Sequence, residues 1–412
     1  MNIKGKSLSL NLKKLLYCCG FIGFFASGTI CEMTDYQQFQ KPILIFSIII
    51  LILGVGIVKK HSGINGIIRT SYNLSYILFF ISMLCSFIVH FETGILINAF
   101  GVILIWWVTN WTMPYARSKG IYSLEREWFL LAFFQSLILG YTIITSGVTI
   151  NRFQGIFYNS NATGGAGATL CAIAIPYFLF VYLNRKRGDT TKLIFSVIVI
   201  VLSVFVTLIS TSRTSILTVA GMLVLMFLLM IKEINNKKRL LRIALIVVMA
   251  IIVLFFMLRS QYVESILEVI IEKFVARKGN EFAGRQNRWD IVFDRLSFFG
   301  NGEESAIGTH NTFLGFLDEY GYSAIISWAL YIVFSLYNSL RIAFSKSTNQ
   351  MKYLPLFSFV CFFLLSMFEG MMLKTIMLIC LYSGNIIYLI KKEIGEKGKI
   401  KVYINKRGYY ET

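Results

Sequence analysis

Acidic residues, histidine and proline are scarce in this chain of 412 residues. Asp and Glu number 21 against 40 Lys and Arg, and the sequence has three histidines and four prolines. Charged residues make up 15% of the chain and hydrophobic residues 56%, whereas soluble domains have about a quarter of their residues charged. This scarcity of charge excludes a soluble globular protein of this length and indicates a membrane protein.

Long apolar runs recur along the whole chain, each of about 17 to 20 residues, the length of a helix that crosses a bilayer. They lack the alternating pattern of a transmembrane β-barrel, and no internal repeat of the kind found in many transporters is evident. No cleavable signal peptide is evident either, so the first span is expected to stay as an anchor. We expect an all-α polytopic membrane protein of about twelve transmembrane helices, at 15–31, 42–58, 72–90, 94–113, 128–145, 162–183, 193–209, 216–231, 243–258, 322–340, 353–368 and 375–390.

The net charge of +19 would suggest nucleic acid as a partner of a soluble chain. Here Lys and Arg concentrate in the first residues, in alternate loops and in the tail 391–412, whereas acidic residues concentrate in the other loops. This asymmetry follows the positive-inside rule. It predicts a multi-pass protein of the cytoplasmic membrane with both termini in the cytoplasm, embedded in the lipid bilayer and without a nucleic-acid partner.

Motifs for metals and soluble cofactors are missing. The seven cysteines lie in or beside apolar runs, and none forms a C-x-x-C pair or has a histidine at metal-ligand spacing. A Gly-rich phosphate loop and a Ser-His-Asp order are also missing. We therefore expect no metal and no cofactor.

The long polar segment 259–321 lies on the expected outer side. Apolar residues at helical spacing predict amphipathic helices at 263–275 and 286–299. Arg285 and Arg288 share one helix face, which makes them either a cationic rim or a two-pronged clamp on an anion.

A histidine follows in the same segment. His310 lies in a Gly-rich turn before Asn311, and imidazole can exchange a proton near neutral pH. Nearby Asp318 and Glu319 are candidates to orient His310 or to replace it as a base. For His310, Asp318 and Glu319, a structural role is the alternative.

Two more arginines stand beside apolar runs. Arg213 lies in the short polar stretch STSRTS, where it is either a solvated hairpin tip or an anion ligand. Arg152 opens an Asn- and Gly-rich segment that ends at Asn161, just before a helix rich in Ala and Gly. The start of such a helix offers free N–H groups to an anion, or Asn161 simply caps it.

Three segments together resemble the O-antigen ligase and polymerase superfamily, over roughly 151–390. The stretch RFQGIFYNSN, from Arg152 to Asn161, is similar to the family's R-x-x-G-x-F-x-N-x-N pattern, and Ser212-Arg213 is similar to its outer S-R element. The family's signature loop is matched by Arg285-x-x-x-Trp289, Gly300-Asn301-Gly302 and His310-Asn311-x-Phe313-Leu314, with Glu319 and Gly321. The chain departs from the family at Thr214 and Ser160, where a small residue and a proline are usual. Residues 1–150 are expected to supply N-terminal membrane helices only.

This resemblance implies a GT-C-like membrane fold and a metal-independent, inverting glycosyltransferase. Its donor would be an undecaprenyl-pyrophosphate-linked glycan at the outer membrane face, with the pyrophosphate held by Arg213 and Arg285, together with Arg152 and Arg288. His310 would stand beside the acceptor hydroxyl, with Asn161, Asn311 and Glu319 in support. A chain-length regulator and a flippase are the partner proteins that the resemblance suggests.

Within that family, we expect a Wzy-type polymerase that joins lipid-linked repeat units into capsular polysaccharide, exopolysaccharide or O-antigen. The frequent use of Lys, Ile and Asn is typical of an AT-rich bacterium without an outer membrane, which favours a polymerase. A ligase that moves a finished glycan to a lipid, wall or protein acceptor would use the same site. A flippase or transporter, or a non-enzymatic scaffold, is the alternative from another class.

Overall fold

The computed structural model describes residues 2–56, 70–148, 152–184, 189–233, 268, 271, 285–345 and 350–407. In these residues the regular elements are helices, and Met33 and Phe157 form an isolated antiparallel bridge. The α-helices are α1 (Asn2–Ile30), α2 (Gln40–Val55), α4 (Ser71–His90), α5 (Thr93–Trp107), α6 (Met113–Ser118), α7 (Leu124–Ser146), α8 (Ser160–Leu183), α9 (Thr190–Ser210), α10 (Arg213–Glu233), α13 (Arg285–Asp294), α14 (Thr312–Ala343), α15 (Tyr353–Ser366) and α16 (Thr375–Arg407). Short helices of other types are η1 (Gln37–Phe39), the π-helical η2 (Val108–Thr112) and η3 (Gln350–Lys352).

The chain is an all-α, multi-pass membrane protein, as its composition predicts. Eight helical stretches in the described residues are long and apolar enough to cross a membrane: Gln37–Val55, Ser71–His90, Thr93–Ser118, Leu124–Ser146, Ser160–Leu183, Thr190–Ser210, Arg213–Glu233 and Thr312–Ala343. Two shorter apolar helices, Tyr353–Ser366 and Thr375–Lys391, match two further expected spans. The expected first span lies within α1. The expected span 243–258 lies outside the described residues, and so does most of the predicted helix 263–275.

Several predicted boundaries were wrong. α1 and α16 continue as helices through the segments expected to be basic tails, because Lys and Arg are good helix formers. α14 begins at Thr312, where Asn311 caps it, and is interrupted at Gly321, so the predicted span 322–340 corresponds to its second part and the stretch 312–320 was not expected as helix. The second loop helix ends at Asp294 rather than 299.

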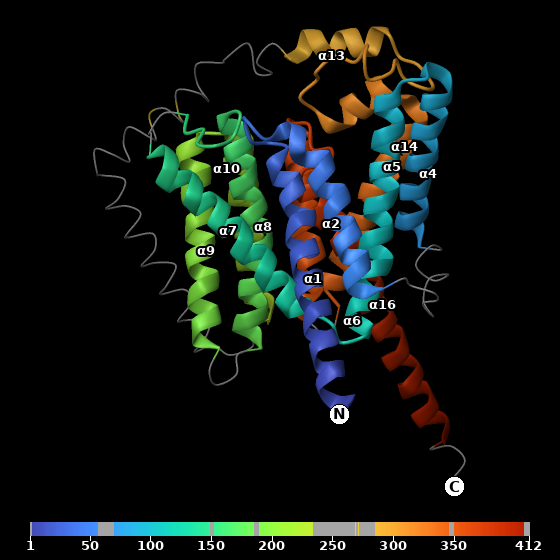
Figure 1. The fold of residues 1–412 in the computed structure, drawn as a ribbon. Coiled ribbons are helices and arrows are strands. Elements are labelled where there is room, and N and C mark those ends of the chain that lie inside the picture. Colours follow the sequence, from blue (N-terminus) through green and yellow to red (C-terminus); the bar gives the residue numbers. More distant parts are fainter. Residues whose placement is uncertain are drawn as a thin grey trace.

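Helix α8 lies at the centre of its neighbours α7, α9, α10 and α15 (Figure 1). Of its most apolar stretch, 78% is buried, against 28–44% in the other seven. Its small side chains allow this close packing, because a Cβ on Gly164 would lie 2.7 Å from the Ser210 hydroxyl and one on Gly167 2.5 Å from the Thr207 hydroxyl. The turn from α9 to α10 therefore rests directly on the first turns of α8.

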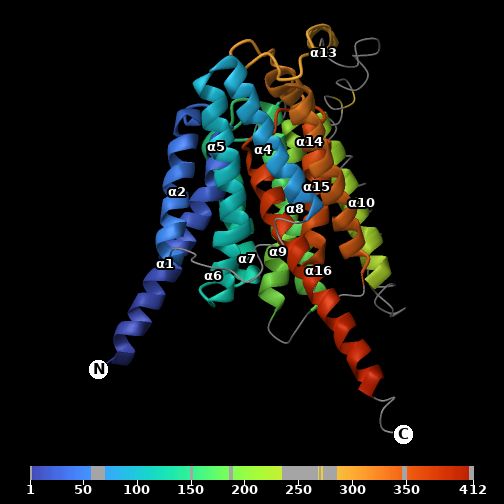
Figure 2. The ribbon, with the colours of Figure 1, turned by 90° about the vertical axis from the view of Figure 1, so that its right-hand side faces the viewer.

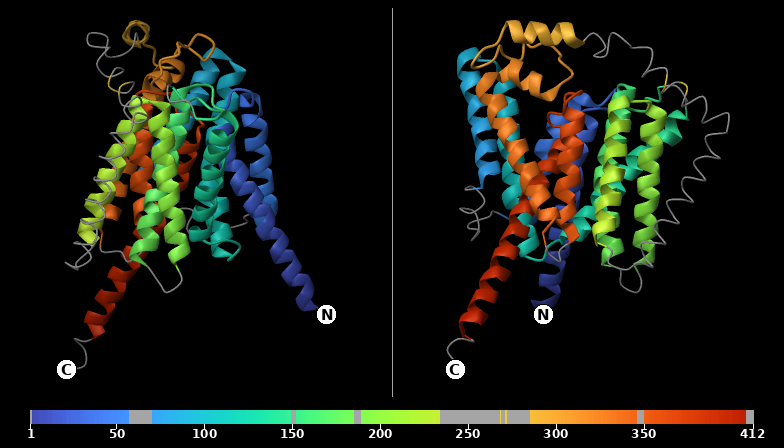
Figure 3. Two further views of the ribbon diagram at one scale, coloured as in Figure 1. Left: turned by 90° about the vertical axis from the view of Figure 1, so that its left-hand side faces the viewer. Right: turned by 180° about the vertical axis from the view of Figure 1, so that it is seen from behind.

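The two chain ends project from the same end of the bundle, and α13 lies across the opposite end (Figures 2 and 3). Near the termini end, Glu127 of α7 is fully buried and accepts hydrogen bonds from Tyr17 of α1 at 2.6 Å and Tyr382 of α16 at 2.5 Å. Arg117 of α6 stands 3.7 Å from the same carboxylate. Because a charge inside the bundle needs such partners, this group of four residues ties the first and last helices to α6 and α7.

A glycine bend shapes the end of the bundle below α13. Gly321 interrupts α14 with φ 84° and ψ −172°, a conformation that is essentially restricted to glycine. A Cβ there would lie 2.3 Å from the Phe298 carbonyl oxygen. The loop before α14 thus packs directly on the bend.

We predict that Gly321→Ala lowers the free energy of unfolding by about 2 kcal/mol or more, because it adds both backbone strain and a clash. Thermal unfolding of the purified full chain in detergent measures this loss. Gly101→Ala is the matched control, since a Cβ on this helical glycine meets nothing within 4 Å. Equal melting temperatures for the two variants would contradict the prediction.

Candidate functional site

The turn 367–374 between α15 and α16 forms the base of the candidate site. Asn311 donates to the Met367 carbonyl at 2.9 Å. The Thr312 hydroxyl donates to the Glu369 carbonyl at 2.8 Å and accepts from the Met371 amide at 2.9 Å. Since these contacts come from the first residues of α14, they fix the turn against that helix.

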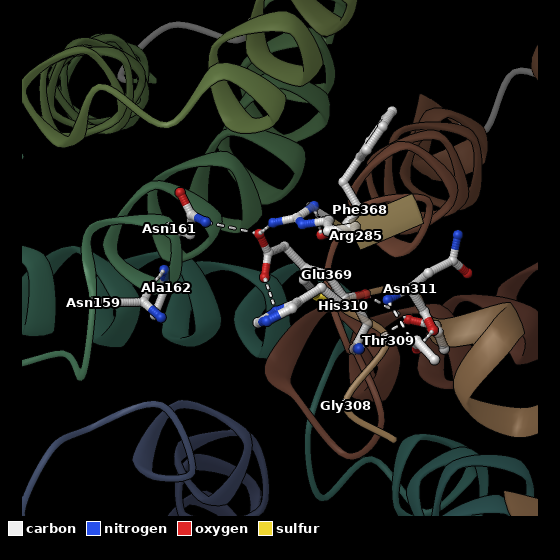
Figure 4. Close-up of polar contacts among 12 residues, drawn as sticks. Asn159, Asn161, Ala162, Arg285, Gly308, Thr309, His310, Asn311, Phe368 and Glu369 are labelled. Carbon is white, nitrogen blue, oxygen red and sulfur yellow. Dashed lines mark hydrogen bonds and ion pairs between the residues drawn. The ribbon is translucent and has the colours of Figure 1, made fainter. Parts of the chain in front are cut away.

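The Glu369 carboxylate brings three predicted site residues together (Figure 4). Its Oε1 accepts a hydrogen bond from Asn161 at 2.9 Å and lies 3.3 Å from Nη2 of Arg285. Its Oε2 lies 3.9 Å from Nδ1 of His310. The other arm of Arg285 donates to the Phe368 carbonyl at 2.7 Å. A guanidinium, an imidazole and an amide from three distant segments thus meet at one carboxylate.

The cluster is partly open. The Arg285 and Glu369 side chains are 20% and 11% exposed, whereas that of His310 is 49% exposed. His310 has a left-handed backbone with φ 51°, which is uncommon outside glycine and occurs often at functional sites. One side of the imidazole faces the carboxylate and much of the ring is accessible to a second molecule.

Helix α13 holds the histidine loop in place. Arg288 donates to the Gly308 carbonyl at 2.8 Å, and the indole of Trp289 donates to the Thr309 carbonyl at 3.0 Å. Both contacts hold the backbone just before His310. In this structure Arg288 therefore supports the loop, rather than forming a clamp with Arg285 on one anion.

Asn311, Asp318 and Glu319 also take structural positions. The Asn311 carboxamide oxygen accepts from the amides of Phe313 and Leu314 and so caps α14. Asp318 does not orient His310; its carboxylate accepts from Arg295 at 2.5 and 2.7 Å, from Asn301 at 2.9 Å and from the Ile307 amide at 2.8 Å. This network folds the segment between α13 and His310.

Glu319 lies in α14 and contacts a different part of the loop. Its backbone carbonyl accepts from Ser86 of α4 and from the Gly302 amide. The predicted support of His310 by Glu319 therefore stays a prediction, and the carboxylate that faces the imidazole is that of Glu369.

The first turn of α8 places Asn161 within hydrogen-bond distance of Glu369. Asn159, and not Asn161, is the N-cap of α8, because its side chain accepts from the Ala162 amide at 2.8 Å. The capping role expected for Asn161 was therefore wrong, and its amide is left to reach across to Glu369. Ser160 lies between Asn159 and Asn161 in the sequence.

Arg152 and Arg213 lie on neighbouring turns. Arg152 is exposed with φ 56°, and the next residue, Phe153, donates its amide to the Ile209 carbonyl at 3.2 Å. Arg213 begins α10 and is half-buried, on the turn that packs against Gly164 one helical turn beyond Asn161. Both arginines thus belong to the same end of the bundle as Glu369, on its α8–α10 side.

A second ion pair stands beside the first. Lys374 lies 3.0 Å from Glu32, which follows α1, and 3.4 Å from the Tyr158 hydroxyl. Burial acts to lower the pKa of Lys374, but the adjacent Glu32, Tyr158 and Cys31 outweigh burial and raise this pKa above its ordinary value. Lys374 therefore stays charged and joins the end of α1 to the 367–374 turn.

Sequence patterns did not single out Glu369, Lys374 or Glu32 as site residues. The available signal was weak: each is a charged residue in a short segment between apolar runs, where solvated turns also carry charge. No group of three or more His, Cys, Asp or Glu in the described part of the chain is placed to hold a metal ion.

The arrangement suits chemistry on an anion. A guanidinium binds two phosphate oxygens at once, and a carboxylate beside an imidazole can orient the ring for proton transfer. In comparisons with protein-family models and with curated proteins, the chain matches none of them.

We predict that Asp318→Ala lowers the free energy of unfolding by about 3 kcal/mol, because it leaves Arg295 without its buried partner. Melting temperature and limited proteolysis of the 295–311 segment measure the effect. Asp290→Ala on the exposed face of α13 is the matched control. A segment as resistant in Asp318→Ala as in the control would refute the role of this network.

Proposed function

We propose that this protein is a Wzy-type polysaccharide polymerase, a metal-independent inverting glycosyltransferase of the outer face of the cytoplasmic membrane. Its donor is a growing glycan on an undecaprenyl-pyrophosphate carrier, and its acceptor is the non-reducing end of a new lipid-linked repeat. The observation that carries the proposal is the convergence of Arg285, His310 and Asn161 on one carboxylate. All three belong to the segments that resemble the O-antigen ligase and polymerase superfamily.

The proposed side of the membrane rests on charge. Arg285 of the Glu369 cluster begins α13, which lies at the end of the bundle opposite both chain ends (Figure 1). The terminal segments 1–14 and 391–412 are rich in Lys, which the positive-inside rule assigns to the cytoplasm. This supports an outer position for the cluster, where a flipped lipid-linked glycan is accessible.

The proposed reaction is a single displacement. The acceptor hydroxyl oxygen forms a bond to the anomeric carbon of the donor sugar while the bond from that carbon to the pyrophosphate oxygen breaks. His310 takes the hydroxyl proton, and the pyrophosphate leaves with the bonding electrons. Arg285 stabilises the charge that grows on the leaving group, and Arg213, Arg152 and Arg288 add positive charge at the same end of the bundle.

We predict that His310→Ala slows chain growth by about 100-fold or more, the scale of general-base catalysis. Arg285→Ala and Arg213→Ala should each slow it by about 100-fold, the scale of one lost oxyanion donor. The assay measures polymer formed by the purified full chain from lipid-linked repeat units. Arg341→Ala, at the far end of α14, is the control and should keep full activity. Undiminished turnover in any of the three site variants at normal abundance removes that residue from the mechanism.

We also predict that a strain lacking this protein accumulates single lipid-linked repeat units on the outer side of the membrane. Thin-layer chromatography of extracted lipids, with and without an impermeant sugar-oxidising label, distinguishes the outer from the inner pool. Repeat units on the inner side would identify a flippase. Finished chains without their final acceptor would identify a ligase. Either result would overturn the proposal of a polymerase.

A further inference from the structure

We propose that the donor pyrophosphate displaces Glu369 from Arg285, and that the released carboxylate moves onto His310. Glu369 is thus a positioning residue that couples donor binding to the state of the base. This inference rests on the proposed function for the identity of the donor. Its geometric basis is the division of one carboxylate between two partners, with Oε1 toward Arg285 and Oε2 toward His310.

The Arg285 guanidinium is the place where exchange begins. Its Nη2 is engaged by Glu369 at 3.3 Å, longer than the 2.7–2.9 Å of a close charged hydrogen bond. Its Nη1 is held by the Phe368 carbonyl at 2.7 Å. The arm therefore stays in position when the carboxylate leaves. An arriving phosphate carries more negative charge than Glu369 and takes its place on Nη2.

The carboxylate has a near alternative partner. Glu369 Oε2 stands 3.9 Å from His310 Nδ1, about 1 Å beyond hydrogen-bond distance, and a small side-chain rotation closes such a gap. The Thr312 contact is to the Glu369 backbone, so the turn stays in place during this rotation. Once bonded through Nδ1, the imidazole presents Nε2 to the acceptor hydroxyl, the arrangement that orients a general base.

Other charged groups nearby are engaged by contacts of their own. Glu32 is occupied by Lys374, with Tyr158 on the same ammonium, and Arg288 donates to Gly308. Arg152 and Arg213 lie on the α8–α10 side. Arg285 is therefore the cation that shares its anion directly with the imidazole. It follows that the donor binds first and that Glu369 engages His310 second. This order limits activation of the acceptor hydroxyl when no donor is bound.

The test separates binding from turnover in the full chain reconstituted in lipid nanodiscs. We predict that Glu369→Gln binds inorganic pyrophosphate about tenfold more tightly than the wild type, equivalent to about 1.4 kcal/mol. The neutral amide no longer competes for Arg285 yet keeps an oxygen that accepts from Asn161. Chain growth should nevertheless fall about tenfold or more, because His310 loses its carboxylate. Isothermal titration calorimetry and the polymer assay measure the two effects, and a merely structural residue would not raise affinity while lowering turnover.

Two further variants complete the test. Glu32→Gln removes a neighbouring negative charge that does not contact Arg285, so its pyrophosphate affinity should change less than twofold. Adding Arg285→Ala to Glu369→Gln should abolish the tighter binding. The proposed exchange is overturned if Glu369→Gln binds pyrophosphate no more tightly than the wild type. It is also overturned if Glu32→Gln gains as much pyrophosphate affinity as Glu369→Gln. If pyrophosphate binds as predicted but wild-type protein makes no polymer, the proposed function fails while the exchange stands.

Discussion

The interaction on which the site depends is the contact of Glu369 with Arg285, Asn161 and His310. These groups come from α13, α8 and the loop before α14, and Glu369 itself comes from the turn between α15 and α16. A carboxylate at the edge of an apolar bundle is costly to desolvate, so it needs partners of opposite charge or hydrogen-bond donors. The same requirement that stabilises the carboxylate therefore gathers the groups suited to bind an anion and move a proton.

Charge pairing of this kind recurs through the bundle. Glu127 is neutralised by Arg117 and two tyrosines near the termini, Glu32 by Lys374 beside the site, and Asp318 by Arg295 in the loop. The tyrosine contacts of Glu127 and the Glu32–Lys374 pair join segments that are far apart in sequence, whereas Arg295 and Asp318 close a loop of 23 residues. The pairs differ in exposure, because Glu127 is fully buried whereas His310 and Arg285 remain partly open. The exposed imidazole of His310 distinguishes the candidate site from the pairs that hold helices together.

The loop and the bundle end are matched by backbone geometry as well as by charge. Gly321 bends α14 so that the 298–300 backbone can approach it, and α13 holds the backbone just before His310 through Arg288 and Trp289. The histidine is therefore held between a rigid helix start and a surface helix. Such support from both sides keeps an exposed imidazole at a defined distance from its carboxylate.

Hydrophobic runs and the position of charge determined the all-α multi-pass class and most of its helices, because a span must be apolar over a fixed length whatever its neighbours are. The sequence also pointed to His310, one of three histidines, and to Arg285 and Asn161 through the segments that resemble the superfamily. It could not identify Glu369 or Lys374, or choose Asn159 over Asn161 as the cap of α8. It also missed the helical stretch 312–320 that precedes the bend at Gly321. Those outcomes depend on which segments meet across the bundle, and only tertiary packing decides that, because a buried charge acquires its role from the partner that neutralises it.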